Sequence, residues 1–207
     1  MGRVSDARDR MIDATIDLIR RASYSSVTVD AICDVAKVKK GSFYHFFKSK
    51  DDLVVAALET HWEKRRPELD QLFSPVHAPL DRLRNYFASV FEKQTDLRKK
   101  YGHFVGCLYS SVGAGVSEAS PEIRKHVQQI LSNYQRYYES ALRDAQARGQ
   151  IRVDDIPGKA QSLFAFMEGV LSQARIHDDP QVVQNLGDNA LRFLGLSEAS
   201  APTASTR

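Results

Sequence analysis

Apolar residues recur at helical spacing along almost the whole chain, and this periodicity constrains the fold more than any other feature of the sequence. Over residues 8–22, for example, Ile12, Thr15, Ile16 and Ile19 follow the i, i+3, i+4, i+7 pattern of an amphipathic helix. No stretch shows the two-residue alternation of a half-buried strand, and no internal repeat is visible. We therefore predict an all-α fold.

Residues that cap or interrupt helices divide this pattern into separate elements. Thr28 and Ser49 each precede an apolar-periodic stretch and are expected to act as N-caps. Residues 37–39 form a brief break between two short helices, and the helix that follows Ser49 should end before Pro67. Longer helices are predicted over residues 79–94, 104–118, 121–149, 157–177 and 180–194. Residues 197–207 are small and polar and predict a disordered tail.

Composition and cysteine usage predict a soluble protein of the cytoplasm with no membrane partner. Of the 207 residues, 43% are hydrophobic and 27% are charged, which is ordinary for a globular protein. No run approaches about eighteen uninterrupted apolar residues, as a membrane-spanning helix requires, and aspartates interrupt any N-terminal signal sequence. Cys33 and Cys107 are far apart and form no CxxC pair, which favours free thiols in a reducing compartment.

The positive charge of the chain is concentrated in its first quarter. Residues 1–50 contain ten Lys/Arg and six Asp/Glu, whereas the whole chain contains 29 and 26. The first 50 residues therefore carry a net charge of +4 and the remainder carries −1. Such asymmetry predicts a polyanion-binding end on a roughly neutral body.

Residues 39–53, KKGSFYHFFKSKDDL, combine cations with aromatic rings in the basic quarter of the chain. A capped short helix, a three-residue turn and a second short helix over residues 40–47 make a helix-turn-helix unit, whose second helix enters the DNA major groove. We expect Phe43, Phe46 and Phe47 to point inward and hold this small unit together. The cations and hydroxyls are then left on the outer face, toward DNA.

Each polar residue of this unit has an expected role at DNA. Lys39 and Lys40 should approach phosphates or guanine edges, and the small Gly41 and Ser42 permit close approach. Tyr44 and His45 can reach phosphates or a thymine methyl group. Thr28 and Lys50 lie at helix N-termini, which bind phosphate through free N–H groups. Any one of these lysines could equally be ordinary solvated surface; it is the whole set that predicts a DNA interface.

The stretch TVDAICDVAKVKKGSFYHFFKSKDDL, residues 28–53, resembles the DNA-binding signature of the TetR family of bacterial transcriptional regulators. The matching features are the threonine at the helix start, Ile32, the Lys-Gly-Ser before Phe-Tyr, and Ser-Lys-Asp-Asp-Leu. Lys37 departs from the family pattern, which usually has glycine in the turn. A lysine in a left-handed conformation costs about 1 kcal/mol, although Lys37 could instead add a phosphate contact.

The resemblance implies a DNA-binding domain over residues 1–52 and an all-helical ligand-binding and dimerisation domain over residues 53–196. In that family the last long helices of two chains pair as a four-helix bundle. The expected dimer interface is the broad apolar stripe made by Leu163, Phe164, Met167, Val170, Leu171 and Ala174. The alternative is that all six face the core of one chain.

The resemblance also implies a pocket for a small-molecule effector between the middle helices. Aromatic walls with a few hydroxyls suit a small, partly apolar ligand. The expected lining residues are Trp62, Tyr86, Phe104, Cys107, Tyr134 and Tyr138. Each of these residues taken alone is more often ordinary core.

Cys107 has a second possible role, because Gly106-Cys107 is similar to a GC pair in a subset of these regulators that respond to electrophiles. A cysteine at a helix start, assisted by His103, would be a reactive thiolate whose modification is the signal. The alternative is a buried, inert cysteine. Cys33 lies on an apolar helical face and is expected in the core.

No enzyme motif is present: the sequence lacks HExxH and GxSxG, and Gly113-Ala-Gly115 is only a fragment of a nucleotide fingerprint. His103 and Cys107 supply two metal ligands where structural zinc needs four, so we expect no metal and no cofactor. The sequence therefore predicts a homodimeric, ligand-responsive repressor of a palindromic operator. A helical ligand-binding protein with no DNA role is the other reading.

Overall fold

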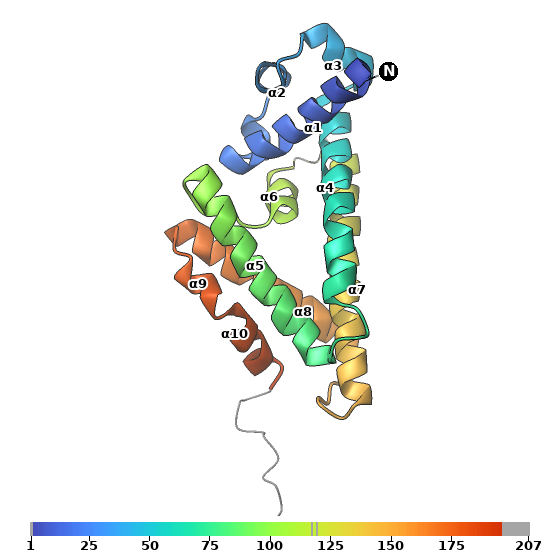
Figure 1. The fold of residues 1–207 in the computed structure, drawn as a ribbon, viewed down its shortest axis with the longest axis vertical. Helices are drawn as coiled ribbons and strands as arrows, with labels where there is room; N and C mark the ends of the chain where they lie inside the picture. The colour runs from blue at the N-terminus through green and yellow to red at the C-terminus, as the bar shows by residue number, and fades with distance from the viewer. Residues whose placement is uncertain (1, 117, 119, 196–207) are drawn as a thin grey trace, which may run out of the picture.

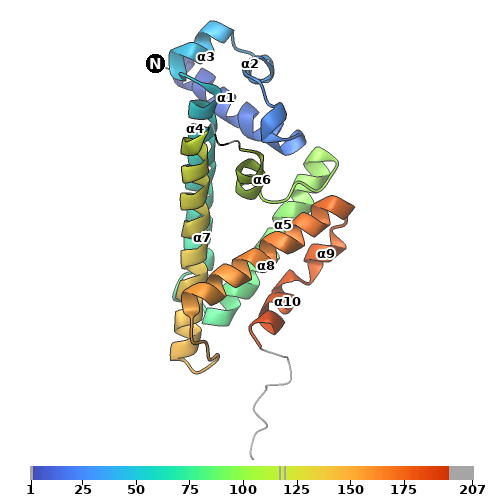
Figure 2. The same cartoon turned by 180° about the vertical axis from the view of Figure 1, so that it is seen from behind.

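The computed structural model of the protein describes residues 2–116, 118 and 120–195, and every regular element within them is helical, which confirms the all-α prediction. Helices α1–α3 gather at one end of the elongated molecule, and the long helix α4 runs from them along the body (Figures 1 and 2). The elements in chain order are α1 (Gly2–Arg21), the 3₁₀ turn η1 (Tyr24–Ser26), α2 (Val29–Ala36), α3 (Lys40–Phe46), α4 (Lys50–Leu72), α5 (Pro79–Tyr101), α6 (Leu108–Gly115), α7 (Pro121–Ala147), α8 (Ile156–His177), α9 (Gln181–Gln184) and α10 (Leu186–Phe193). The predicted tail, residues 197–207, lies outside the described residues.

Local capping determines the ends of the short N-terminal helices. The Thr28 hydroxyl accepts a hydrogen bond from the Ala31 N–H at 3.2 Å, and the Ser49 hydroxyl accepts one from the Asp52 N–H at 3.1 Å. Each bond satisfies an N–H group that the first helical turn leaves free. The two N-caps predicted from the sequence are therefore present, at the starts of α2 and α4.

Lys37 ends α2 in the left-handed conformation, with φ 54° and ψ 48°. Its N–H donates to the Asp34 carbonyl at 3.2 Å, which closes the tight turn between α2 and α3. The turn thus keeps the geometry that glycine would give, with a lysine in its place.

Replacing Lys37 with glycine should raise the free energy of unfolding by about 1 kcal/mol, because glycine adopts positive φ without the Cβ clash. Thermal unfolding should shift upward by roughly 2–4 °C. The matched control is Lys37→Ala, which keeps the Cβ and should give no gain. Equal stability of the two variants would contradict a left-handed residue at this turn.

Helix α4 continues through Pro67 to Leu72, so the predicted end before Pro67 is wrong. Proline removes the backbone bond to the Glu63 carbonyl, at a cost of about 3 kcal/mol. Beyond it, however, Leu69 is fully buried and Phe73 packs against the rings of three tyrosines. Burying two such side chains contributes roughly 1.5–3 kcal/mol each, which is enough to keep the helix intact.

Other helix boundaries also differ from prediction, and α1 begins at Gly2, six residues before the expected start. Helix α5 runs to Tyr101 and ends at Gly102, whose φ of 77° provides a left-handed cap. The predicted helix over residues 104–118 is shorter, because α6 spans only Leu108–Gly115. The last predicted helix is divided into α9 and α10 at Asn185.

Helix α8 packs into the body of a single chain with most of its apolar side chains. Leu163, Phe164, Met167, Leu171 and Ala174 are each between 0 and 6% exposed. The Phe164 ring lies 5.9 Å from Tyr138 and 6.2 Å from Tyr134 of α7. This corrects the predicted dimer interface, because five of its six residues have no surface left for a partner. Val170 is half-buried and packs at the edge of this buried stripe.

Candidate DNA-binding surface and effector cavity

The rings of α3 are sorted by face, as the sequence pattern indicates. Phe43 is fully buried, Phe47 is 5% exposed and Phe46 is half-buried, whereas Tyr44 is 59% exposed. His45 and Gly41 are also exposed, and a side chain added at Gly41 would meet nothing within 4 Å. The outer face of α3 therefore presents a phenol, an imidazole and an open backbone position.

The lysines around α3 differ in how they are held. Lys40 Nζ lies 2.7 Å from Asp30 Oδ1, and this hydrogen bond raises the pKa of Lys40. Lys50 Nζ donates to the Val27 carbonyl at 3.1 Å and lies 4.3 Å from the centre of the Tyr24 ring. Lys37 and Lys39 are exposed and make no ion pair with any residue that the structure describes. Lys37 and Lys39 can therefore meet a phosphate directly, whereas Lys40 and Lys50 would first leave a partner within the protein.

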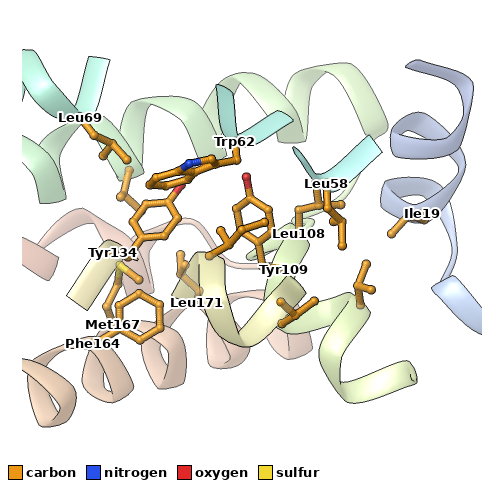
Figure 3. Packing of buried hydrophobic residues seen from close by; sticks show 14 of the residues in the cluster. Ile19, Leu58, Trp62, Leu69, Leu108, Tyr109, Tyr134, Phe164, Met167 and Leu171 are labelled. Atoms are coloured by element: carbon orange, nitrogen blue, oxygen red, sulfur yellow. The ribbon is translucent and has the colours of Figure 1, made fainter. Parts of the chain in front are cut away.

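A cavity of about 400 Å³ lies within the body and reaches the DNA-binding end of the molecule. Its apolar wall comes from α5, α6, α7 and α8, and Figure 3 shows part of this wall, with Tyr109, Tyr134, Phe164, Met167 and Leu171. The lining residues are Arg20, His61, Lys64, Arg65, Glu68, Tyr86, Val90, Lys93, Gln94, Asp96, Leu97, Gly106, Cys107, Leu108, Tyr109, Tyr134, Phe164, Met167, Glu168 and Leu171. The volume is that of a small-molecule site.

Three of the predicted pocket residues line this cavity, namely Tyr86, Cys107 and Tyr134. The other three, Trp62, Phe104 and Tyr138, are core residues that do not line it. Trp62 packs edge-on against the Tyr134 ring with centroids 5.2 Å apart (Figure 3). The Tyr138 hydroxyl is directed to the Met167 sulfur at 3.3 Å. Trp62 and Tyr138 thus pack against the wall residues Tyr134 and Met167 without lining the cavity themselves.

The polar half of the lining is not among the residues predicted from the aromatic pattern. His61, Lys64, Arg65 and Glu68 follow i, i+3, i+4, i+7 spacing on α4, and all four line the cavity. Polar residues at core spacing on a helix that also carries a buried apolar face are a signal in the sequence. Arg20 gave no such signal, since it lies in the last turn of α1.

The charged lining residues are largely paired with one another. Glu68 forms ion pairs with both Arg65 and Lys93, which joins α4 to α5. His61 lies between two cavity residues: Arg20 Nη2 is 2.9 Å from its Nε2, and the Tyr109 hydroxyl is 2.7 Å from its Nδ1. Burial, together with the positive charge of Arg20, lowers the pKa of His61 to about 3. The imidazole is therefore neutral at neutral pH.

Cys107 occupies the N-cap position of α6, lines the cavity and is half-buried. Burial raises the pKa of its thiol to about 12, and the neighbouring Glu168 contributes in the same direction. His103, the expected assistant, has its Nε2 at 3.3 Å from the Arg20 carbonyl instead. The structure thus favours the inert cysteine over the reactive thiolate.

Cys107 should consequently react with N-ethylmaleimide about a thousandfold more slowly at neutral pH than a free cysteine of pKa about 8.5, because the thiolate is the reacting species. The rate should rise about tenfold for each pH unit up to the thiol pKa. Mass spectrometry of a Cys33→Ser variant isolates the reaction at Cys107, and Cys107→Ser is the control. Fast labelling that releases bound DNA would restore the electrophile-sensor hypothesis.

Comparison with known proteins agrees with both halves of the architecture. Residues 11–57 match the family model for bacterial regulatory proteins of the tetR family, and residues 79–188 match the model for the tetracyclin repressor-like C-terminal domain. The chain is 31% identical over 176 residues to the transcriptional regulator AcuR of Cereibacter sphaeroides, which covers 84% of this chain and 78% of that protein.

Two further comparisons extend this result. The HTH-type transcriptional repressor NemR of Escherichia coli K12 is 24% identical over 87% of this chain and 89% of its own. The crystal structure of a regulatory protein TetR from Rhodobacter sphaeroides superposes with a TM-score of 0.79 at 30% identity, covering 90% of this chain and 98% of that one. The helix-turn-helix unit, the cavity-bearing helical body and these matches lead to one conclusion: the chain belongs to the TetR family of bacterial transcriptional regulators.

Proposed function

We propose that the protein is a homodimeric repressor that binds a palindromic operator through α3 and is released when a small molecule occupies the cavity. The observation that carries this proposal is the position of Arg20, which belongs to α1 of the DNA-binding end and also lines the cavity. A ligand in the cavity would therefore contact α1, the helix that packs against α2 and α3. A ligand that prefers the DNA-incompetent arrangement lowers operator affinity.

The operator contacts come from the residues predicted for this role, Thr28, Lys37, Lys39, Lys40, Gly41, Ser42, Tyr44, His45 and Lys50. Two copies of α3, about one DNA turn apart in a dimer, would read two half-sites related by symmetry. Gly41 and Ser42 allow the backbone to approach the groove, while the lysines supply salt-dependent phosphate contacts.

The dimer forms through the outer face of α8 and the adjoining α10. Ile176 is 70% exposed and Phe193 is 41% exposed, and the Phe193 ring stacks on Phe166 with centroids 5.4 Å apart. Gly169, Gln173 and Ile176 are exposed on one side of α8, and the half-buried Phe166 and Val170 flank them at the edge of the core. We call these five residues and Phe193 the α8–α10 face. An exposed apolar stripe of this kind is typical of a subunit interface.

The decisive experiment is a selection of duplexes, from fragments of the source genome, that bind the purified protein at physiological salt. We expect recovery of a short palindrome with two half-sites, and binding that weakens steeply as salt rises. Recovery of nothing above background by a folded protein would contradict the repressor function.

A further inference from the structure

Three cavity residues form a hydrogen-bonded chain whose direction is fixed by chemistry. A guanidinium has donors and no acceptor, so Arg20 must donate to His61 Nε2. The neutral imidazole then carries its proton on Nδ1 and donates it to the Tyr109 hydroxyl oxygen, 2.7 Å away. The chain therefore runs from Arg20 through His61 to Tyr109, with each group donating to the next.

Tyr109 stands at the end of this chain with its own hydroxyl proton unused. The ring is 2% exposed, and among the described residues no acceptor for that proton lies within hydrogen-bond distance. The Tyr134 ring, which also lines the cavity, lies 6.0 Å from the Tyr109 ring. A buried donor without an acceptor is costly, which makes this part of the cavity a site for an acceptor from outside the chain.

The charge of the cavity indicates which kind of acceptor fits. Four basic residues line it, Arg20, Lys64, Arg65 and Lys93, against the three acids Glu68, Asp96 and Glu168. Lys64 also pairs with Asp13 and Asp96 with Lys99, so one positive charge remains in excess when these partners are counted. Burial also raises the pKa of Glu168. A carboxylate is favoured over a neutral carbonyl by this surplus, and an ammonium group is disfavoured.

We propose that the effector is a small carboxylate with an apolar body, that Tyr109 donates to its carboxylate oxygen, and that His61 and Arg20 couple this contact to α1. The inference rests on the proposed function, because it names the ligand class of the same cavity. The apolar body lies on Phe164, Met167 and Leu171, and the head group faces α4 and α6. A shift of Tyr109 on α6 would pull on His61 of α4 and on the last turn of α1.

The tautomer of His61 is the first test and needs no ligand. A proton–nitrogen correlation spectrum of the histidine side chains of the full-length protein at neutral pH should show His61 protonated on Nδ1 alone, in contrast to the usual Nε2–H form. The same spectrum of Tyr109→Phe should show a shifted His61 signal. His61 found with Nε2–H, or as the imidazolium ion, would overturn the chain.

Three probes of equal chain length test the ligand class: hexanoate, hexanamide and hexylamine. Hexanoate should raise the unfolding temperature of the wild-type protein, and its Kd should increase at least about tenfold in Tyr109→Phe, as for loss of a hydrogen bond to a charged group. The matched control is Tyr101→Phe, which removes a hydroxyl bonded to Asp17 outside the cavity and should leave the hexanoate Kd unchanged.

Each other outcome contradicts a named part of the proposal. Equal hexanoate affinity in wild type and Tyr109→Phe would remove Tyr109 from recognition. Hexanamide binding as tightly as hexanoate would overturn the preference for charge, and no response to hexanoate, or an equal response to hexylamine, would overturn the carboxylate class. Failure to bind any selected duplex contradicts the repressor function itself, whereas a protein that binds its operator and ignores hexanoate contradicts only the ligand class.

Discussion

Replacing Ile176 with aspartate should convert the protein from a dimer to a monomer and weaken binding to a two-half-site operator by roughly a hundredfold or more. Ile176 is 70% exposed in one chain and lies on the α8–α10 face. At a symmetric interface the substitution places two carboxylates against apolar surface, and desolvating each costs several kcal/mol. A monomer binds each half-site independently. In a dimer, binding of one subunit holds the second subunit at high local concentration near the other half-site.

Sedimentation velocity gives the mass of the variant, and a gel-shift titration with the intact operator gives its affinity. Val76→Asp is the matched control, because Val76 is 83% exposed in the loop between α4 and α5 and is not part of the α8–α10 face. The control should remain dimeric and bind normally. A dimeric Ile176→Asp protein with unchanged operator affinity would show that the subunits meet elsewhere.

Replacing Asp144 with asparagine should lower the free energy of unfolding by about 2–3 kcal/mol, because it leaves a buried guanidinium without its counter-ion. The Arg82 side chain is 1% exposed; it donates to the His77 carbonyl at 3.1 Å and to Asp144 Oδ2 at 2.6 Å. This pair fastens α5 to α7. Water reaches Asp144, whose side chain is 45% exposed, so the expected loss lies at the lower end of the range for buried pairs.

Thermal unfolding should occur roughly 5–10 °C lower in Asp144→Asn. The matched control is Asp81→Asn, which breaks the Arg84–Asp81 pair of 3.1 Å between side chains that are both about half exposed. That change should stay within about 0.5 kcal/mol of wild type. Similar small losses in both variants would mean that Arg82 is stabilised by its remaining hydrogen bond alone.

The structure of the DNA-binding end could be predicted closely because it depends on contacts between residues that are close in the sequence. Thr28 and Ser49 satisfy N–H groups three residues away, and the order of rings and cations along α3 determines which face is buried. Contacts over so few residues can be recognised from the residue types at neighbouring positions of the sequence. The left-handed Lys37 shows that the requirement for a tight turn outweighs the preference of one residue.

The body could be predicted only in part, because its important contacts join residues far apart in the chain. Periodicity shows that a helix has an apolar stripe but not which neighbour covers it, so the sequence of α8 alone does not distinguish the core of one chain from a partner subunit. Pro67 was interpreted as a helix end, since the burial of Leu69 and Phe73 that offsets it depends on tertiary packing. The contact of Arg20 with His61 spans 41 positions and has no local signature.

The continuity of helix α4 limits how the N-terminal DNA-binding domain could be exchanged between regulators of this architecture. It begins beside α3 with Lys50, continues past His61 at the cavity, and ends at Leu72 without a break. A continuous helix transmits angle as well as distance: one inserted residue rotates everything beyond it by about 100° and moves it by about 1.5 Å. A grafted domain would therefore have to join α4 in the same helical phase, or its α1 would face away from the cavity and the chimera would bind DNA without responding to its ligand.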